Sequence, residues 1–175
     1  MIAAGKAAAQ VSQGVFVARQ FCVNLVVSVI MTIVMTLLIF HGRDAVPLWG
    51  LGNLVFDLVP STLLPTLAAT MAISKVTGAA MRKGLIAPLP PTGWARLPRN
   101  DALAGLALGA GLLVVLGAGY VIALTLTCHD RPIAIPAVIG CKLVYAAILC
   151  LANTPVIVAR ARMQSGRGPH EDRSA

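Results

Sequence analysis

Four long apolar segments dominate this 175-residue chain. They lie at about residues 20–40, 47–74, 102–127 and 133–159, and each is as long as the roughly 20 residues that a helix needs to cross a bilayer. Hydrophobic residues make up 58% of the chain and charged residues only 11%, against roughly 25% charged in soluble domains. The sequence therefore predicts an all-α membrane protein, with four transmembrane helices in a single integral membrane domain over residues 1–175.

Lysine and arginine lie mainly on one side of the predicted membrane. The N-terminal segment, the connector at residues 75–101 and the tail at residues 160–175 carry most of them, whereas the two short hairpins carry only Arg43 and Arg131. The positive-inside rule therefore predicts that both termini and the connector are cytoplasmic. The net charge of +8 is explained by anionic lipid at that surface, and nothing indicates a nucleic-acid partner.

The connector carries the sequence LIAPLPPTGWARLPRND, whose prolines prevent a continuous helix. We expect it to lie on the membrane surface, the alternative being a ligand for a domain that binds proline-rich segments. Asn100 is the residue type that commonly caps a helix, so it should start the third span.

The two halves of the chain share one plan. Each has a span, a hairpin containing His, Arg and Asp, a second span that opens with proline, and a basic exit. Aligning Pro47 with Pro136 also aligns Asn53 with Lys142. This pattern is consistent with a duplicated two-helix hairpin in parallel orientation, with chance similarity as the alternative.

Polar residues recur at four-residue intervals in the first two spans, which places them on single helix faces. The face of the first span consists of Asn24, Ser28, Thr32 and Thr36. The face of the second span consists of Asn53, Asp57 and Ser61, with a neighbouring line of Thr62, Thr66, Thr70 and Ser74. Such faces either pack against another helix or line a hydrated path.

Asp57 and Lys142 are the only Asp, Glu, Lys, Arg or His residues well inside the predicted spans. Counted from Pro47, Asp57 should lie about 15 Å deep, and Lys142 about 9 to 15 Å below the same face. A charge at that depth costs about 2.5 to 3.5 kcal/mol, so we expect the two residues to face each other, with Tyr145 one turn further along. The pair is either structural, fixing how the halves dock, or functional, opened by a proton, an ion or an anionic substrate.

Two further patterns concern helix packing. Pro60 and Pro65 predict a kink just beyond Asp57, where carbonyls lose their helical donors. Gly105 and Gly109 form a GxxxG motif in the third span, which is typical of close helix packing or dimerisation. Because four helices make a small bundle, we expect a homodimer or a larger membrane complex.

No pattern in the sequence indicates chemistry at a catalytic centre. The cysteines and histidines lack metal-ligand or haem spacing, and there is no nucleophile with its base and no phosphate-binding glycine loop. We therefore expect no enzymatic activity, no metal and no cofactor.

Residues 24–75 contain SVIMTIVMT followed by a tryptophan, an aspartate and a proline in the next span. This segment resembles a family of small uncharacterised bacterial inner-membrane proteins built from two-span units. The resemblance implies a multi-pass location in the bacterial inner membrane, and it implies no activity.

Together these patterns favour a small permease-like or transport-associated protein. Its predicted intramembrane polar site comprises Asp57, Lys142, Asn53, Ser61, Tyr145, Asn24, Ser28 and Thr32. The alternative is a non-transporting accessory or assembly subunit of a larger membrane complex, whose polar faces and glycine helix serve docking.

Overall fold

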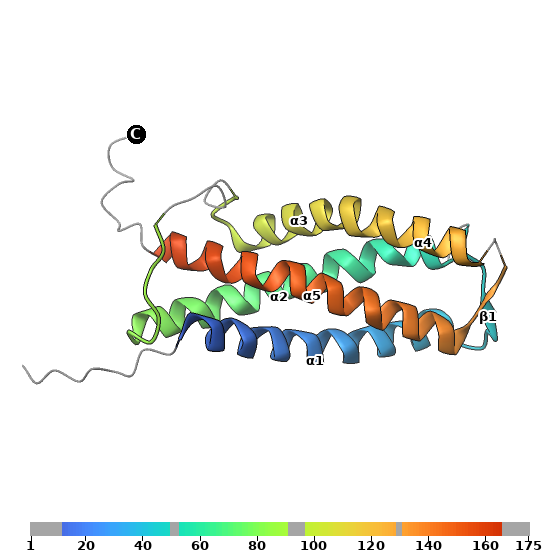
Figure 1. Cartoon of the computed structure of the whole chain (residues 1–175), viewed down its shortest axis with the longest axis horizontal. Helices are drawn as coiled ribbons and strands as arrows, with labels where there is room; N and C mark the ends of the chain where they lie inside the picture. Colours follow the sequence, from blue (N-terminus) through green and yellow to red (C-terminus); the bar gives the residue numbers. More distant parts are fainter. Residues whose placement is uncertain (1–11, 50–52, 91–96, 129–130, 166–175) are drawn as a thin grey trace, which may run out of the picture.

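The structure is a bundle of long helices lying side by side along one axis (Figure 1). It is a computed structural model that describes residues 12–49, 53–90, 97–128 and 131–165. That part contains four helices long and apolar enough to cross a membrane, in agreement with the predicted all-α fold. They are α1 (Gln13–Ile39), α2 (Leu54–Arg82), the continuous series α3 (Asp101–Leu112), η2 (Leu113–Gly117) and α4 (Ala118–Cys128), and α5 (Ile135–Ser165).

The central pair of the bundle is α2 and α5, which pack against each other. Helix α1 packs mainly on α5 and helix α3 mainly on α2, so each outer helix lies against the second span of the other half. In Figure 1 α1 and the α3 to α4 series accordingly form opposite edges of the bundle. The outer helices leave broad apolar faces uncovered, as Val26 (59% exposed) and Leu126 (71% exposed) show.

The two hairpins meet at one end of the bundle. Strand β1 (Ala45–Val46) pairs antiparallel with β2 (Ile133–Ala134), Ala45 opposite Ala134 and Val46 opposite Ile133. A backbone bond from Ile135 N to Asp44 O, 3.2 Å long, extends the pairing. The inward-facing strand residues Val46 and Ile133 belong to a buried apolar cluster at this end, whose other members are Phe40, Leu48, Leu54, Leu124 and Val138.

Helix α2 is displaced along the chain relative to the predicted span at 47–74. It begins only at Leu54. The described residues of that span before Leu54 are not helical, and the carbonyls of Pro47 and Leu48 accept hydrogen bonds from the first two N–H groups of the helix, those of Leu54 and Val55. These carbonyls satisfy donors that every helix N-terminus leaves open.

The same helix continues into the predicted connector at 75–101 and ends at Arg82. Residues 75–82 contain no proline, so nothing stops the helix there. Gly84 ends it with a φ of +70°, while Gly84 N bonds to Met81 O and Leu85 N to Ala80 O. This pair of bonds around a left-handed glycine is the Schellman termination.

The predicted tail at 160–175 is also helical at its start, since α5 continues to Ser165. Arg160 and Arg162, expected as tail cations, are buried under the connector. Arg162 Nε donates to Ala87 O at 2.8 Å, and Leu89 N donates to Arg162 O at 3.4 Å. The connector therefore packs on the last turns of α5.

The third span packs closely on α2 through glycine. A Cβ on Gly105 would lie 3.0 Å from Leu67 Cα, and one on Gly109 would lie 3.1 Å from Leu63 Cδ2. The GxxxG motif thus serves contact within one chain.

The π-helical segment brings a third glycine onto the same face. In an unbroken α-helix, Gly117 would point about 80° away from the direction of Gly109, because eight residues make two full turns and about 80° more. The π-helical segment η2 offsets this rotation, because it takes more residues per turn, and Gly117 also faces α2 at Leu58.

Candidate functional site

A buried ion pair joins α2 to α5 near the hairpin end of the bundle. Lys142 Nζ of α5 donates to Asp57 Oδ2 of α2, and the two side chains are only 4% and 3% exposed. The expectation that these two residues face each other is confirmed. The position of Asp57 along its helix is corrected: because α2 begins at Leu54, Asp57 lies in the first turn of the helix and not near its middle.

The position of Asp57 in the first turn of α2 stabilises the negative charge of its carboxylate. The N-terminal end of a helix carries a partial positive charge, so both Lys142 and the helix end attract the carboxylate. Burial removes water from both charges, and that desolvation offsets much of their attraction. Asp57 Oδ1 is buried and has no hydrogen-bond partner among the described residues. One of the two carboxylate oxygens therefore remains unsatisfied beside a satisfied one.

One aromatic ring lies beside the pair, and two tyrosine rings pack together one helical turn further along α5. Lys142 Nζ lies 6.0 Å from the centroid of the Phe40 ring, within the range of a cation–π interaction. The rings of Tyr120, from α4, and Tyr145, from α5, have centroids 4.9 Å apart at an interplanar angle of 49°. The Tyr120 hydroxyl is buried without a partner in the described part of the chain.

Tyr145, predicted one turn beyond Lys142, binds Thr62 with its hydroxyl 2.8 Å from Thr62 Oγ1. Thr62 Oγ1 also lies 2.8 Å from the Leu58 carbonyl, to which it donates. A threonine hydroxyl has one hydrogen, so Tyr145 is the donor to Thr62. The resulting chain from Tyr145 to Thr62 to the α2 backbone is a second polar link between α2 and α5.

The structure does not bring all the predicted site residues together. Asn53 is the N-cap residue of α2, and its amide donates to Trp49 O. Ser61 is half-buried and makes no side-chain hydrogen bond within the described residues. The buried polar line of α2 instead follows Thr62, Thr66 and Thr70. The predicted face of Asn53, Asp57 and Ser61 therefore contributes only Asp57 to the site.

The polar face of α1 packs against α5 away from the ion pair. Asn24 Nδ2 donates to Asn153 Oδ1 at 3.3 Å and to Thr154 Oγ1 at 3.1 Å. Ser28 Oγ accepts from Cys150 Sγ at 3.2 Å. Thr32 is half-buried and makes no side-chain hydrogen bond in the described part. Helix packing, one of the two interpretations of this face, is therefore what Asn24 and Ser28 do.

Sequence reasoning missed three contributors. Asn153 and Thr154 stand together in an otherwise apolar stretch of the fourth span, and this signal could have identified them as partners for Asn24. Tyr120 carries no comparable signal, because its place beside Tyr145 depends on how the third span packs on α2.

No group of three or more His, Cys, Asp or Glu residues able to hold a metal ion occurs in the part of the chain that the structure describes. No protein-family model matches the chain, and no curated protein or solved structure is significantly similar to it. The resemblance of residues 24–75 to small inner-membrane proteins thus stays a prediction from the sequence.

Proposed function

We propose that the chain is a multi-pass protein of the bacterial inner membrane, permease-like or transport-associated, whose polar site is the Asp57 and Lys142 pair. The observation that carries this proposal is a buried ion pair in which Asp57 Oδ1 has no partner among the residues that the structure describes. Paired ionisable residues inside membrane-spanning helices commonly mark ion pathways and proton relays.

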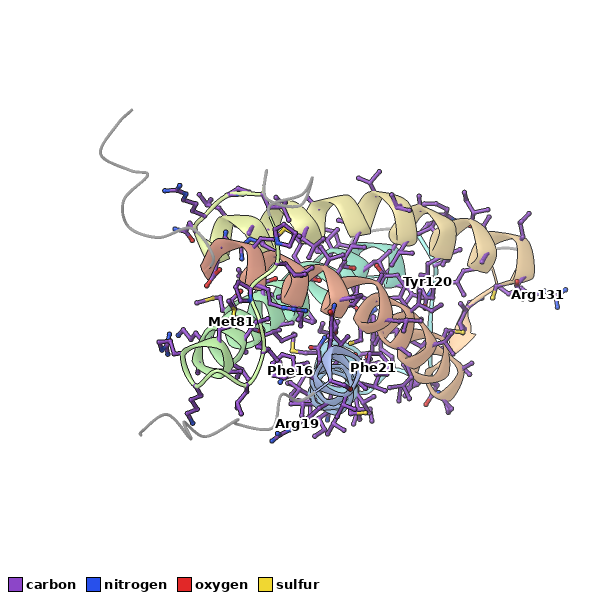
Figure 2. The ribbon with its side chains drawn as sticks, turned by 60° about the vertical axis from the view of Figure 1, so that its left-hand side comes forward. Phe16, Arg19, Phe21, Met81, Tyr120 and Arg131 are labelled. Atoms are coloured by element: carbon purple, nitrogen blue, oxygen red, sulfur yellow. The ribbon has the colours of Figure 1, made fainter. Side chains whose placement is uncertain are left out.

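The exposed faces support the membrane location. Large aliphatic side chains face outward along α1 and the third span, including Leu38 (67% exposed) and Val114 (71% exposed). The hairpin end carries Arg131, while Arg19 lies toward the opposite end, and both side chains point away from the bundle (Figure 2). Lys75, Arg82 and Lys83 also lie toward that opposite end, which we assign to the cytoplasm.

The proposed step is a proton-linked opening of the pair. A proton on Asp57 Oδ1 neutralises the carboxylate and removes most of the attraction that holds Lys142. Lys142 Nζ already lies over the Phe40 ring, so the released ammonium has an aromatic face within reach. A buried ammonium without a counter-ion then favours entry of an anion or water.

A duplicated two-helix hairpin is part of the proposal. The alignment of Pro47 with Pro136 also places Ala45 on Ala134, and these two residues are paired with each other in the β1 and β2 ladder. The exchanged packing, α1 on α5 and α3 on α2, has the form expected from two related halves around an axis along the bundle.

Reconstitution tests the transport proposal. Purified wild-type protein and the Asp57→Asn/Lys142→Met double variant, which removes both charges, are placed in liposomes with an entrapped pH-sensitive dye and an imposed membrane potential. Wild type is expected to carry protons faster than protein-free liposomes, and the folded double variant is not. Equal fluxes through both proteins, or no flux above the protein-free control, would reject this function.

The second candidate is an accessory or assembly subunit. The outer position of the third span favours it, because α4 buries only Leu124 and leaves a face that a partner helix could cover. This candidate predicts no flux at all. It also predicts copurification of the chain with a larger complex in mild detergent, identified by mass spectrometry.

A further inference from the structure

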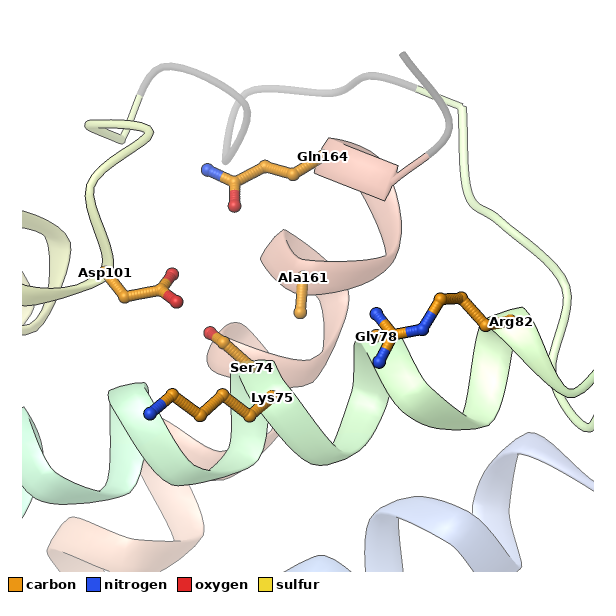
Figure 3. Close-up of a pocket in the computed structure, with 7 residues that line it drawn as sticks. All are labelled: Ser74, Lys75, Gly78, Arg82, Asp101, Ala161 and Gln164. Atoms are coloured by element: carbon orange, nitrogen blue, oxygen red, sulfur yellow. The ribbon is translucent and has the colours of Figure 1, made fainter. Parts of the chain in front are cut away.

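A polar cleft lies between α2, α3 and α5 at the end of the bundle opposite the hairpins (Figure 3). It has a volume of about 280 Å³ and is partly open to the surroundings of the protein. Its lining residues are Ser74, Lys75, Gly78, Arg82, Asp101, Ala161 and Gln164. This volume is at the lower limit of known ligand sites, which suits a small headgroup or ion better than a large organic molecule.

The cleft carries an uncompensated positive charge. Lys75 and Arg82 are exposed, and neither has an ion-pair or hydrogen-bond partner among the described residues. Among the described lining residues the one carboxylate is that of Asp101, and it is already paired at 2.7 Å with Arg160, which is 1% exposed. Two cations therefore remain available to an anion.

Glycine creates the hollow between these cations. Gly78 lies between Lys75 and Arg82 on the same face of α2, and the two cations are about two helical turns apart. A Cβ at Gly78 would meet only Arg82 Nη1 within 4 Å, at 3.6 Å. Figure 3 shows the guanidinium of Arg82 directed back over Gly78. A larger side chain at position 78 would thus fill the cleft without displacing the backbone.

Neutral donors complete the lining. Ser74 Oγ accepts from Arg160 Nη1 at 3.4 Å, which leaves its own hydroxyl hydrogen to donate. Gln164, half-buried at the upper rim in Figure 3, carries an amide group. A planar guanidinium, an ammonium and a hydroxyl are the donor set that recognises a phosphate group with several oxygens.

We propose that this cleft binds a phosphate-bearing anion, and that in the membrane this anion is the headgroup of an anionic phospholipid. Basic pockets between helices at the cytoplasmic surface are suited to such headgroups, because lipid phosphates lie at the same level as the helix ends. The inference depends on the proposed membrane location, but it is independent of whether the Asp57 and Lys142 pair supports transport.

Native mass spectrometry of delipidated full-length protein tests the site. The probes are phosphatidylglycerol, phosphatidylcholine and inorganic phosphate. The cleft variants are Lys75→Gln/Arg82→Gln, which removes both cations, and Gly78→Leu, which fills the hollow at unchanged charge. The control is Arg19→Gln/Lys83→Gln, which loses the same charge from exposed positions outside the cleft.

We expect wild type and the control to bind phosphatidylglycerol at least tenfold more tightly than either cleft variant, and more tightly than they bind phosphatidylcholine. If inorganic phosphate shows this dependence on the variants and phosphatidylglycerol does not, the site holds and free phosphate is its ligand. Equal binding of all probes by cleft and control variants overturns the proposal. Membrane fractionation of wild type shows separately whether the proposed location fails.

Discussion

Arg160 Nη1 of α5 and Asp101 Oδ1, at the first residue of α3, lie 2.7 Å apart. The other terminal nitrogen of the same guanidinium, Nη2, donates to the carbonyls of Pro98 and Arg99 at 2.6 and 3.1 Å. One buried side chain thus joins α5 to both the end of the connector and the start of the third span.

Removal of this side chain should loosen the connector. Arg160→Met loses charge-assisted hydrogen bonds worth about 1.5 to 3 kcal/mol each, and the carbonyls of Pro98 and Arg99 lose their donor. We expect cleavage by trypsin after Arg99 to be several-fold faster in detergent solution than in wild type. Arg160→Lys should restore little of this protection from trypsin, because a single ammonium cannot reach the Asp101 carboxylate and both carbonyls at once as the planar guanidinium does. Lys83→Met, at an exposed site with no such contacts, is the control and should cleave at the wild-type rate.

Substitutions of Asp57 and Lys142 should have strongly non-additive effects on the free energy of unfolding. Lys142→Met leaves a buried carboxylate without its counter-ion and should lower the free energy of unfolding by about 3 to 5 kcal/mol. Asp57→Asn in the same background should recover most of that loss, because no uncompensated charge then remains. Unfolding in mixed micelles measures the full cycle. Additive single effects would show that the two charges are not paired.

The hydrogen bond between Tyr145 and Thr62 should contribute only modestly to the free energy of unfolding. Tyr145→Phe removes one hydrogen bond, about 1 kcal/mol, while Thr62 keeps its bond to Leu58 O. Thr62→Val should lower the free energy of unfolding by a similar amount. The variant with both changes should lose less than the sum of the two single losses, because the two residues share one hydrogen bond. Tyr120→Phe is the control, since that hydroxyl has no partner among the described residues and its loss should cost nothing measurable.

The glycines of the third span should differ sharply in their tolerance of alanine. Gly105→Ala places a Cβ 3.0 Å from Leu67 Cα, and such overpacking against backbone typically costs about 1 to 3 kcal/mol. Gly111→Ala meets nothing within 4 Å and should be neutral, or stabilising by up to about 1 kcal/mol through helix propensity. Thermal unfolding of both variants in detergent measures the difference. Equal effects would exclude close packing of the third span on α2.

The ion pair could be predicted from the sequence for a simple physical reason. Two opposite charges in apolar segments each carry a desolvation cost that falls when they meet, so their pairing follows from sign and approximate depth alone. The presence of Tyr145 near the pair could also be predicted, because it lies one helical turn beyond Lys142. The sequence also predicts Asn53 and Ser61 at this site, because they share a helix face with Asp57, but spacing along one helix does not determine which residues of other helices lie opposite that face.

The sequence by itself determined that the chain forms long apolar helices, that Asn100 caps the third of them, and that Asp57 needs a partner of opposite charge. These properties depend on local composition and on the cost of burying a charge. Only the tertiary structure decided that α2 starts at Leu54, that α1 packs on α5, and that Arg160 is a buried link. Each of these depends on which distant carbonyls and side chains lie close by, and that is set by the packing of whole helices.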